Sequence, residues 1–252
     1  MRTEVSARLV SLAVLLLIWQ VASVLANSAA LPPPANVFSF ILSETASGEL
    51  PMHLWATLRR VAIAFSLAMV FGVGLGVVLG RLPVVDRLAD SWLLVLLNTP
   101  ALIITVLCYV WLGLTEAAAI AAVTLNKAPN VAVIMREGAR SIDPQLEEMR
   151  RAFRFDRRTW LLHVLFPQLE PYVVAAARSG LALVWKIVLV VELLGRPDGV
   201  GFAISYYFQL FDVRALLGYS LVFSTVVLLI DFALLQPLEW HARRWRIVPD
   251  PA

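Results

Sequence analysis

The sequence is poor in charge and almost free of cysteine. Only 15% of its 252 residues are charged, whereas about a quarter is usual for a soluble globular domain. A single cysteine, Cys108, excludes an intrachain disulfide and a cysteine-based metal site. The three histidines, His53, His163 and His241, lack the spacing of zinc ligands. We therefore expect no metal site in this chain.

Catalytic and nucleotide-binding patterns are also missing. The glycine-rich segment "GVGLGVVLGR" at residues 72–81 lacks the Gly-Lys-Ser/Thr ending of a phosphate-binding loop. No group of residues is typical of an active site. We expect a chain that is not an enzyme, has no catalytic residues, binds no cofactor and does not itself hydrolyse ATP.

Apolar residues are what the sequence has in excess, since 60% of it is hydrophobic. A membrane-spanning helix needs about 20 apolar residues. Backbone groups inside lipid must bond to one another, which favours helices, and no ten-residue alternation of a β-barrel is present. The sequence predicts an all-α, polytopic membrane protein with six transmembrane helices, at residues 6–26, 56–80, 89–113, 115–136, 172–194 and 214–236.

The arginines predict the orientation of these spans. Fourteen arginines fall on one side of the membrane, and the other side has four, Arg59, Arg60, Arg196 and Arg214. Because basic loops stay in the cytoplasm, both termini are expected there. Basic residues between apolar runs fit membrane topology better than nucleic-acid binding. The first run is too long for a typical signal peptide, so it is interpreted as a retained span.

A charged segment interrupts the apolar runs at residues 137–171. Asp143 is a good N-cap and Pro144 suits a first helical position. Asp156 can cap a second helix, and Pro167 and Pro171 are expected to end it. The sequence therefore predicts two short cytoplasmic helices that meet at a bend near residues 154–155.

An apolar stripe runs along the first of these helices, formed by Leu146, Met149 and Phe153 at helical spacing. Physical reasoning allows two interpretations of this stripe. The stripe seats in a groove of a soluble partner, or the hairpin lies on anionic lipid. The acidic Glu147, Glu148 and Asp156 weaken the second interpretation, because they would face a negative surface.

The segment resembles the cytoplasmic loop signature of binding-protein-dependent ABC importer permeases. Aligned on its Leu-Pro end, Glu148 falls at the signature's glutamate and Pro167 at its proline. Phe153 holds the apolar position before the glycine, and Val164 and Leu165 hold the apolar run before the proline. Met149 and Arg150 replace two alanines. Arg154 replaces the glycine, which bears on the geometry of the bend.

Other segments resemble the nitrate/sulfonate/taurine-type permeases. They are "LPPPANVFSFI" (31–41), "ATLRRVAIAFSLAMVFGVGLGVVLGR" (56–81), "YVWLGLTEAAAIAAV" (109–123) and "VELLGRPDGVGFAI" (191–204). The resemblance implies a type I ABC importer permease fold in a bacterial inner membrane. It also implies an N-terminal span at residues 1–30 outside a permease core at 31–252.

The resemblance further implies partners. A second copy of the permease, as a homodimer, would share the membrane with lipid. Two ABC ATPase subunits would bind ATP and magnesium, and a periplasmic or lipid-anchored binding protein would deliver the solute. Residues 143–167 would couple to the ATPase, through Leu146, Glu148, Met149, Arg151, Ala152, Phe153, Asp156 and Pro167.

Polar residues within spans are candidates for the solute pathway, because charge inside a membrane tends to face a cavity or a partner. Each also has a structural explanation, such as an ion pair, a satisfied carbonyl or a side chain that reaches the interface. Basic groups favour an anion such as nitrate, a sulfonate or taurine, with a pyrimidine-type vitamin precursor as the alternative solute. The candidates are Asn98, Thr99, Asn126, Trp185, Lys186 and Glu192.

Two further expectations complete the sequence's predictions. Gly72, Gly76 and Gly80 recur every four residues, a pattern that permits close packing of helices. The rival class of function is an ATPase-independent secondary transporter or channel whose charged loop binds only lipid.

Overall fold

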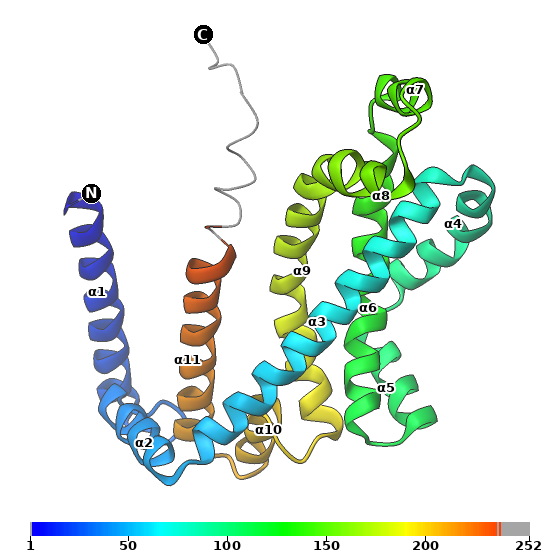
Figure 1. Cartoon of the computed structure of the whole chain (residues 1–252). Coiled ribbons are helices and arrows are strands. Elements are labelled where there is room, and N and C mark those ends of the chain that lie inside the picture. The colour runs from blue at the N-terminus through cyan, green and yellow to red at the C-terminus, as the bar shows by residue number, and fades with distance from the viewer. Residues whose placement is uncertain (1, 236, 238–252) are drawn as a thin grey trace.

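The computed structural model describes residues 2–235 and 237, and every element in that part of the chain is helical (Figure 1). The predicted all-α fold is therefore confirmed for these residues. In chain order the elements are α1 (Arg2–Ala26), α2 (Pro34–Ser47), α3 (Glu49–Arg81), α4 (Pro83–Asn98), α5 (Ala101–Leu112), α6 (Glu116–Arg140), α7 (Pro144–Ala152), α8 (Arg157–Trp160), the π-helical turn η1 (Leu161–Leu165), α9 (Phe166–Gly195), α10 (Val200–Gln209), α11 (Val213–Ile230) and the π-helical turn η2 (Asp231–Leu235).

The bundle has two ends. α7 and α8 lie at one end, which we call the hairpin end, and α10 lies at the opposite end, which we call the far end (Figure 1). α1 begins and α11 ends toward the hairpin end. In the described part of the chain, four helices are long and apolar enough to span a membrane, at Glu49–Arg81, Glu116–Arg140, Arg158–Gly195 and Val213–Ala233. The apolar segment of α1 at Val10–Ala26 is shorter than these four helices.

The predicted span at residues 89–113 is not one helix. α4 and α5 meet at an angle of 98°, so the pair forms either a broken span or a re-entrant loop. Thr99 is extended, with φ −73° and ψ 124°, because the ring of Pro100 disfavours helical geometry in the residue before it. A proline inside an apolar helix produces a kink, and here the structure has a right-angled turn.

The second hairpin helix also differs from its prediction. It does not end at Pro167 or Pro171, because α8 continues through η1 into α9, and Arg158–Gly195 is one continuous helical segment. The Phe166 N–H donates to the Leu161 carbonyl five residues back. Such a wider turn accommodates a proline whose ring and missing N–H would disrupt an ordinary α-helix. Pro167 then occupies the first turn of α9.

The centre of the bundle is a close pairing of α3 with α6, which we call the spine. Gly72 and Gly76 are buried. A Cβ atom at either position would lie 2.5 Å from the Cβ of Val131 or of Met135, respectively. A Cβ on Gly80 would lie 2.5 Å from the Cβ of Ala139. Only glycine lets the two backbones approach this closely.

Ion pairs fix the spine at the hairpin end. Arg136 of α6 donates from Nη1 to Asp86 (3.2 Å) and to Asp90 (2.8 Å), both on α4. Arg140, one turn further along α6, also bonds to Asp86. These contacts hold α4 against α6, although the chain turns sharply between α4 and α5.

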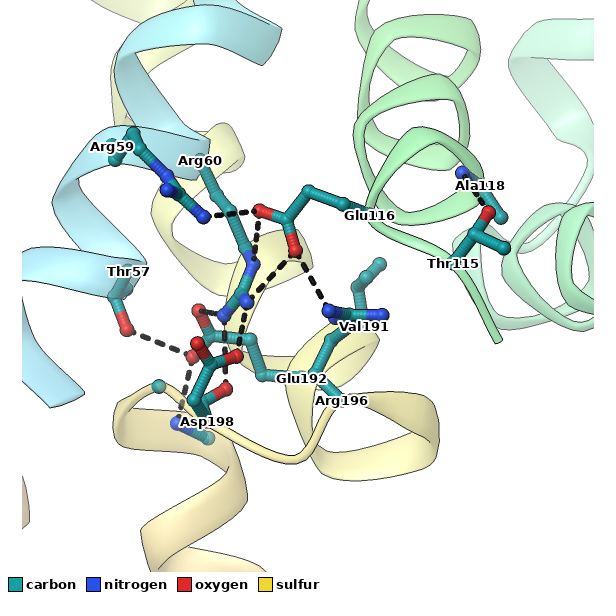
Figure 2. A network of polar contacts seen from close by, with 12 residues as sticks. Thr57, Arg59, Arg60, Thr115, Glu116, Ala118, Val191, Glu192, Arg196 and Asp198 are labelled. Carbon is teal, nitrogen blue, oxygen red and sulfur yellow. Dashed lines mark hydrogen bonds and ion pairs between the residues drawn. The ribbon is translucent and has the colours of Figure 1, made fainter. Parts of the chain in front are cut away.

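A second charge cluster fixes the spine at the far end, and Figure 2 shows it. Arg60 of α3 is 2% exposed and donates to Glu116 of α6 (2.9 Å) and to Glu192 of α9 (2.8 Å). It also bonds to Asp198, in the turn before α10. Arg196 pairs with Glu116 at 2.9 Å. Since removing water from charges is costly, this burial depends on every charge having partners.

The same cluster holds the turn between α9 and α10. Glu192 is fully buried and accepts hydrogen bonds from the Thr57 hydroxyl and the Gly201 N–H, both at 2.9 Å. Thr57 in turn accepts from the Val200 N–H (2.8 Å). The N–H of Gly199 donates to Nδ1 of His53 (3.0 Å). The far ends of α3, α9 and α10 are therefore joined.

The spine predicts that valine substitutions at two glycines of α3 differ sharply in their effect on stability. In Gly76→Val, the added side chain overlaps α6, and we expect the free energy of unfolding to fall by about 1–3 kcal/mol. Gly74→Val is the matched control, because a Cβ there meets nothing within 4 Å. Thermal unfolding of the two purified variants measures the difference. Equal stability would contradict the close pairing of α3 with α6.

The far-end cluster predicts a large loss of stability when Glu192 is replaced. In Glu192→Ala, Arg60 loses one buried carboxylate, and breaking such a pair typically costs about 3–5 kcal/mol. Glu137→Ala is the control, because that glutamate is 55% exposed in its pairing with Arg140, and exposed pairs contribute about 0–1 kcal/mol. Unfolding of both variants is followed in detergent. A Glu192→Ala protein that is as stable as the control would rule out the structural role of Glu192.

Candidate functional site

The polar segment at residues 143–160 forms a hairpin of two short helices, α7 and α8, which we call the coupling hairpin after the role that the sequence resemblance implies. Asp143 caps α7 by accepting the Gln145 N–H at 2.8 Å, and Pro144 is its first residue. Asp156 caps α8 by accepting the N–H groups of Arg158 (3.2 Å) and Thr159 (3.3 Å). Both helix starts lie where the sequence predicts them.

The cap of α8 has an electrostatic consequence. The side-chain hydrogen bond with Thr159, joined by the backbone N–H groups of Thr159 and Arg158, holds the pKa of Asp156 below its usual value. Hydrogen bonds to the ionised form favour it, so Asp156 keeps its negative charge at the N-terminus of α8. The anion lies at the end of the helix where the dipole favours it.

Arg154 forms the bend between the two helices in a left-handed conformation, with φ 50°. The Phe155 N–H donates to the Arg150 carbonyl (3.1 Å), which closes the turn that usually carries glycine after a helix. The hairpin therefore bends at the position of the signature's glycine, although an arginine occupies it. That arginine adopts a backbone conformation that a side chain disfavours.

An aromatic pair forms the tip of the hairpin. Phe153 is 72% exposed and stacks on Phe155, with ring centroids 6.1 Å apart and planes inclined by 22°. Leu146 and Met149 are half-buried, so the predicted apolar stripe is most exposed at Phe153. Glu148, Ala152 and Pro167 are exposed as well. Among the candidate residues of the hairpin, Arg151 is the one whose side chain lies outside the described part of the structure.

Three of the pathway candidates bond to their own helices. The Asn98 amide donates to the Leu94 carbonyl and the Thr99 hydroxyl to the Val95 carbonyl, both at 2.7 Å. The amide of Asn126 donates to a carbonyl one turn earlier in α6, at 2.9 Å. These side chains therefore bond back onto their own helices, and the Val95 carbonyl also accepts the Thr99 N–H (3.0 Å).

The three candidates on α9 lie in different surroundings. Trp185 is buried edge-on against Phe223, with centroids 5.9 Å apart, in the wall of an apolar groove of about 560 Å³. Glu192 lies in the far-end cluster. Lys186 is exposed in the apolar middle of α9, and within the described residues it has no hydrogen-bond or ion-pair partner. The three candidates on α9 therefore differ in burial and in the residues that they contact.

Sequence reasoning missed the role of Arg60. It placed Arg60 at the edge of a span, where an arginine faces a loop, but α3 begins at Glu49 and encloses it. The adjacent basic residues Arg59 and Arg60 inside an apolar helix were the available signal. Their partners lie far along the chain, so the sequence could not name them.

Comparisons with known proteins agree with this architecture. Residues 68–247 match the family model described as "Binding-protein-dependent transport system inner membrane component". The chain is 28% identical to the putative aliphatic sulfonates transport permease of Bacillus subtilis (strain 168), over 93% of this chain and 85% of that protein. It is 27% identical to the nitrate import permease of Synechocystis sp. (strain PCC 6803), over 77% and 74% of the two chains.

A solved structure shares the fold. It is the crystal structure of an amino acid ABC transporter with histidines, with a TM-score of 0.62 over 81% of this chain and 98% of that one, at 18% identity. The importer-permease fold expected from the sequence is therefore confirmed. Because the family model matches well over half of the sequence, the chain belongs to the binding-protein-dependent transport system inner membrane components, the permease subunits of ABC importers.

Proposed function

We propose that the coupling hairpin seats in a cytoplasmic ABC ATPase and transmits its ATP-driven closure to the membrane helices. The observation that carries this proposal is the aromatic tip. Phe153 and Phe155 stack on a hairpin that is rich in charged residues, with Phe153 72% exposed. An apolar anchor framed by charge fits a groove on a soluble partner, where such anchors supply most of the binding energy.

The placement of the hairpin favours this partner over lipid. α7 projects beyond the neighbouring ends of α3 and α9 (Figure 1). A helix bound to lipid lies in the plane of the interface, and Glu148 and Asp156 would there face anionic headgroups. Glu148 and Arg151 are instead suited to fix the register of the hairpin by pairing with charges on the partner.

The same scheme assigns the other partners. Two copies of this chain surround a pathway, each hairpin meets one of two ATPases that bind ATP and magnesium, and a binding protein delivers solute to the far end. Both termini then lie in the cytoplasm of a bacterial inner membrane. The contacts of α1 support its place outside the core, because its side chains bond to the segment before α2. Trp19 donates to the Pro32 carbonyl (3.0 Å) and Ser23 donates to the Leu31 carbonyl (2.7 Å).

The proposed solute is a small anion. Lys186 is an exposed cation in the middle of an apolar helix, and such a charge belongs in a pathway or against a partner rather than in lipid. In a homodimer, each copy would bring one Lys186 to the pathway. The names of the relatives, which concern sulfonates and nitrate, support an anion for this chain too.

The proposed coupling predicts the effect of Phe153→Asp. The charge removes the apolar anchor, and we expect binding to the cognate ATPase to weaken about 30-fold, as for loss of an interface hot spot of about 2 kcal/mol. Co-purification and titration with the ATPase measure this loss. Phe211→Asp is the control, because Phe211 is 83% exposed at the far end. Equal ATPase binding by both variants would favour the rival class, a transporter whose hairpin binds lipid.

The proposed solute class predicts the effect of Lys186→Gln. Loss of a charge-assisted bond of about 1.5–3 kcal/mol should lower uptake of an anion at least about tenfold, whereas Lys186→Arg should retain it. Uptake into proteoliposomes of the complete transporter is measured with nitrate, taurine, an alkanesulfonate and a neutral pyrimidine. Accumulation of the pyrimidine alone, or anion uptake unchanged by Lys186→Gln, would overturn the assignment.

A further inference from the structure

Trp160 lies where the coupling hairpin meets the membrane helices. It is the last residue of α8 and is 5% exposed, whereas the next two residues, Leu161 and Leu162, are 51% and 54% exposed. The apolar cluster at this end of the bundle does not include it; that cluster consists of Val131, Met135, Ala139, Ile142, Leu165, Leu169 and Ala176.

Two guanidinium groups cover the indole ring. The Cζ of Arg150, on α7, lies 5.3 Å from the ring centroid, and the Cζ of Arg81, the last residue of α3, lies 6.0 Å from it. A cation within about 6 Å of a tryptophan face is attracted by the ring's quadrupole. One side chain thus joins three elements, α7, α8 and α3.

The contact with α3 leads directly to the spine. Arg81 follows Gly80, where a Cβ would lie 2.7 Å from the Arg136 carbonyl of α6. The alternative route from the hairpin is the chain itself, which passes through the wider turn η1 before α9 begins. A π-helical turn departs from the regular ladder of hydrogen bonds and often marks a functional position. The indole therefore provides a non-covalent route that bypasses η1.

We propose that Trp160 is a positioning residue that makes α7 and the end of α3 move together when the hairpin is displaced. The inference rests on the proposed coupling to an ATPase. Trp160 and the two arginines form a clamp, in which Arg150 contacts the ring from α7 and Arg81 contacts it from the end of α3. Without the indole, the contacts of Arg150 and Arg81 with its ring would be lost, and a displacement of α7 would reach α3 less completely.

The first test measures transport per ATP in the complete transporter, reconstituted with its ATPase and binding protein. Trp160→Leu keeps an apolar side chain and removes the aromatic face, and we expect uptake per ATP hydrolysed to fall about tenfold while the ATPase stays bound. Trp160→Phe restores an aromatic face and should recover most of the coupling. Trp111→Leu, at a tryptophan that is 73% exposed on α5, is the control. Unchanged coupling in Trp160→Leu, or a Trp160→Phe protein as defective as Trp160→Leu, would overturn the proposal.

The second test reads the clamp directly. Spin labels at the exposed positions Ala152 and Leu82, in a chain whose Cys108 is replaced by serine, report the distance between α7 and the end of α3. In the permease alone, we expect one narrow distance distribution, and a broad one in Trp160→Leu. Identical distributions in the two proteins would overturn the clamp. Because the permease alone gives this distance, a failure of ATPase binding would contradict the proposed coupling and still leave the clamp tested.

Discussion

The close approach of α3 to α6 is the constraint on which the rest of the structure depends. Gly72, Gly76 and Gly80 leave no side chain between the two backbones, so van der Waals contact runs along much of both helices. In a membrane this contact matters more than apolar burial, because lipid tails are as apolar as the helix surface. The spine gives the other helices a fixed support.

Charge then determines what is attached to each end of that support. At the hairpin end, Arg136 and Arg140 bind the two aspartates of α4 and keep that helix beside α6. At the far end, Arg60 joins α3 to α6, α9 and the turn before α10. The spine is therefore braced by ion pairs at both ends.

Local chemistry decided which features could be predicted from the sequence. Asp143 and Asp156 cap helices through bonds to residues two or three positions away, so a short segment contains the whole signal. The partners of Arg60 lie 56, 132 and 138 positions along the chain, and no local pattern could name them. The prediction that a helix ends at Pro167 was wrong for a related reason. The π-helical turn that accommodates this proline has no sequence signature of its own.

The far-end cluster has a consequence for the electric field around the molecule. Its three guanidinium groups, on Arg59, Arg60 and Arg196, face three carboxylates, on Glu116, Glu192 and Asp198. The formal charges cancel within a few ångströms, so the group acts as a set of opposed dipoles whose potential decays faster than that of a single ion. The junction therefore strengthens the bundle while adding almost no net charge to its far end.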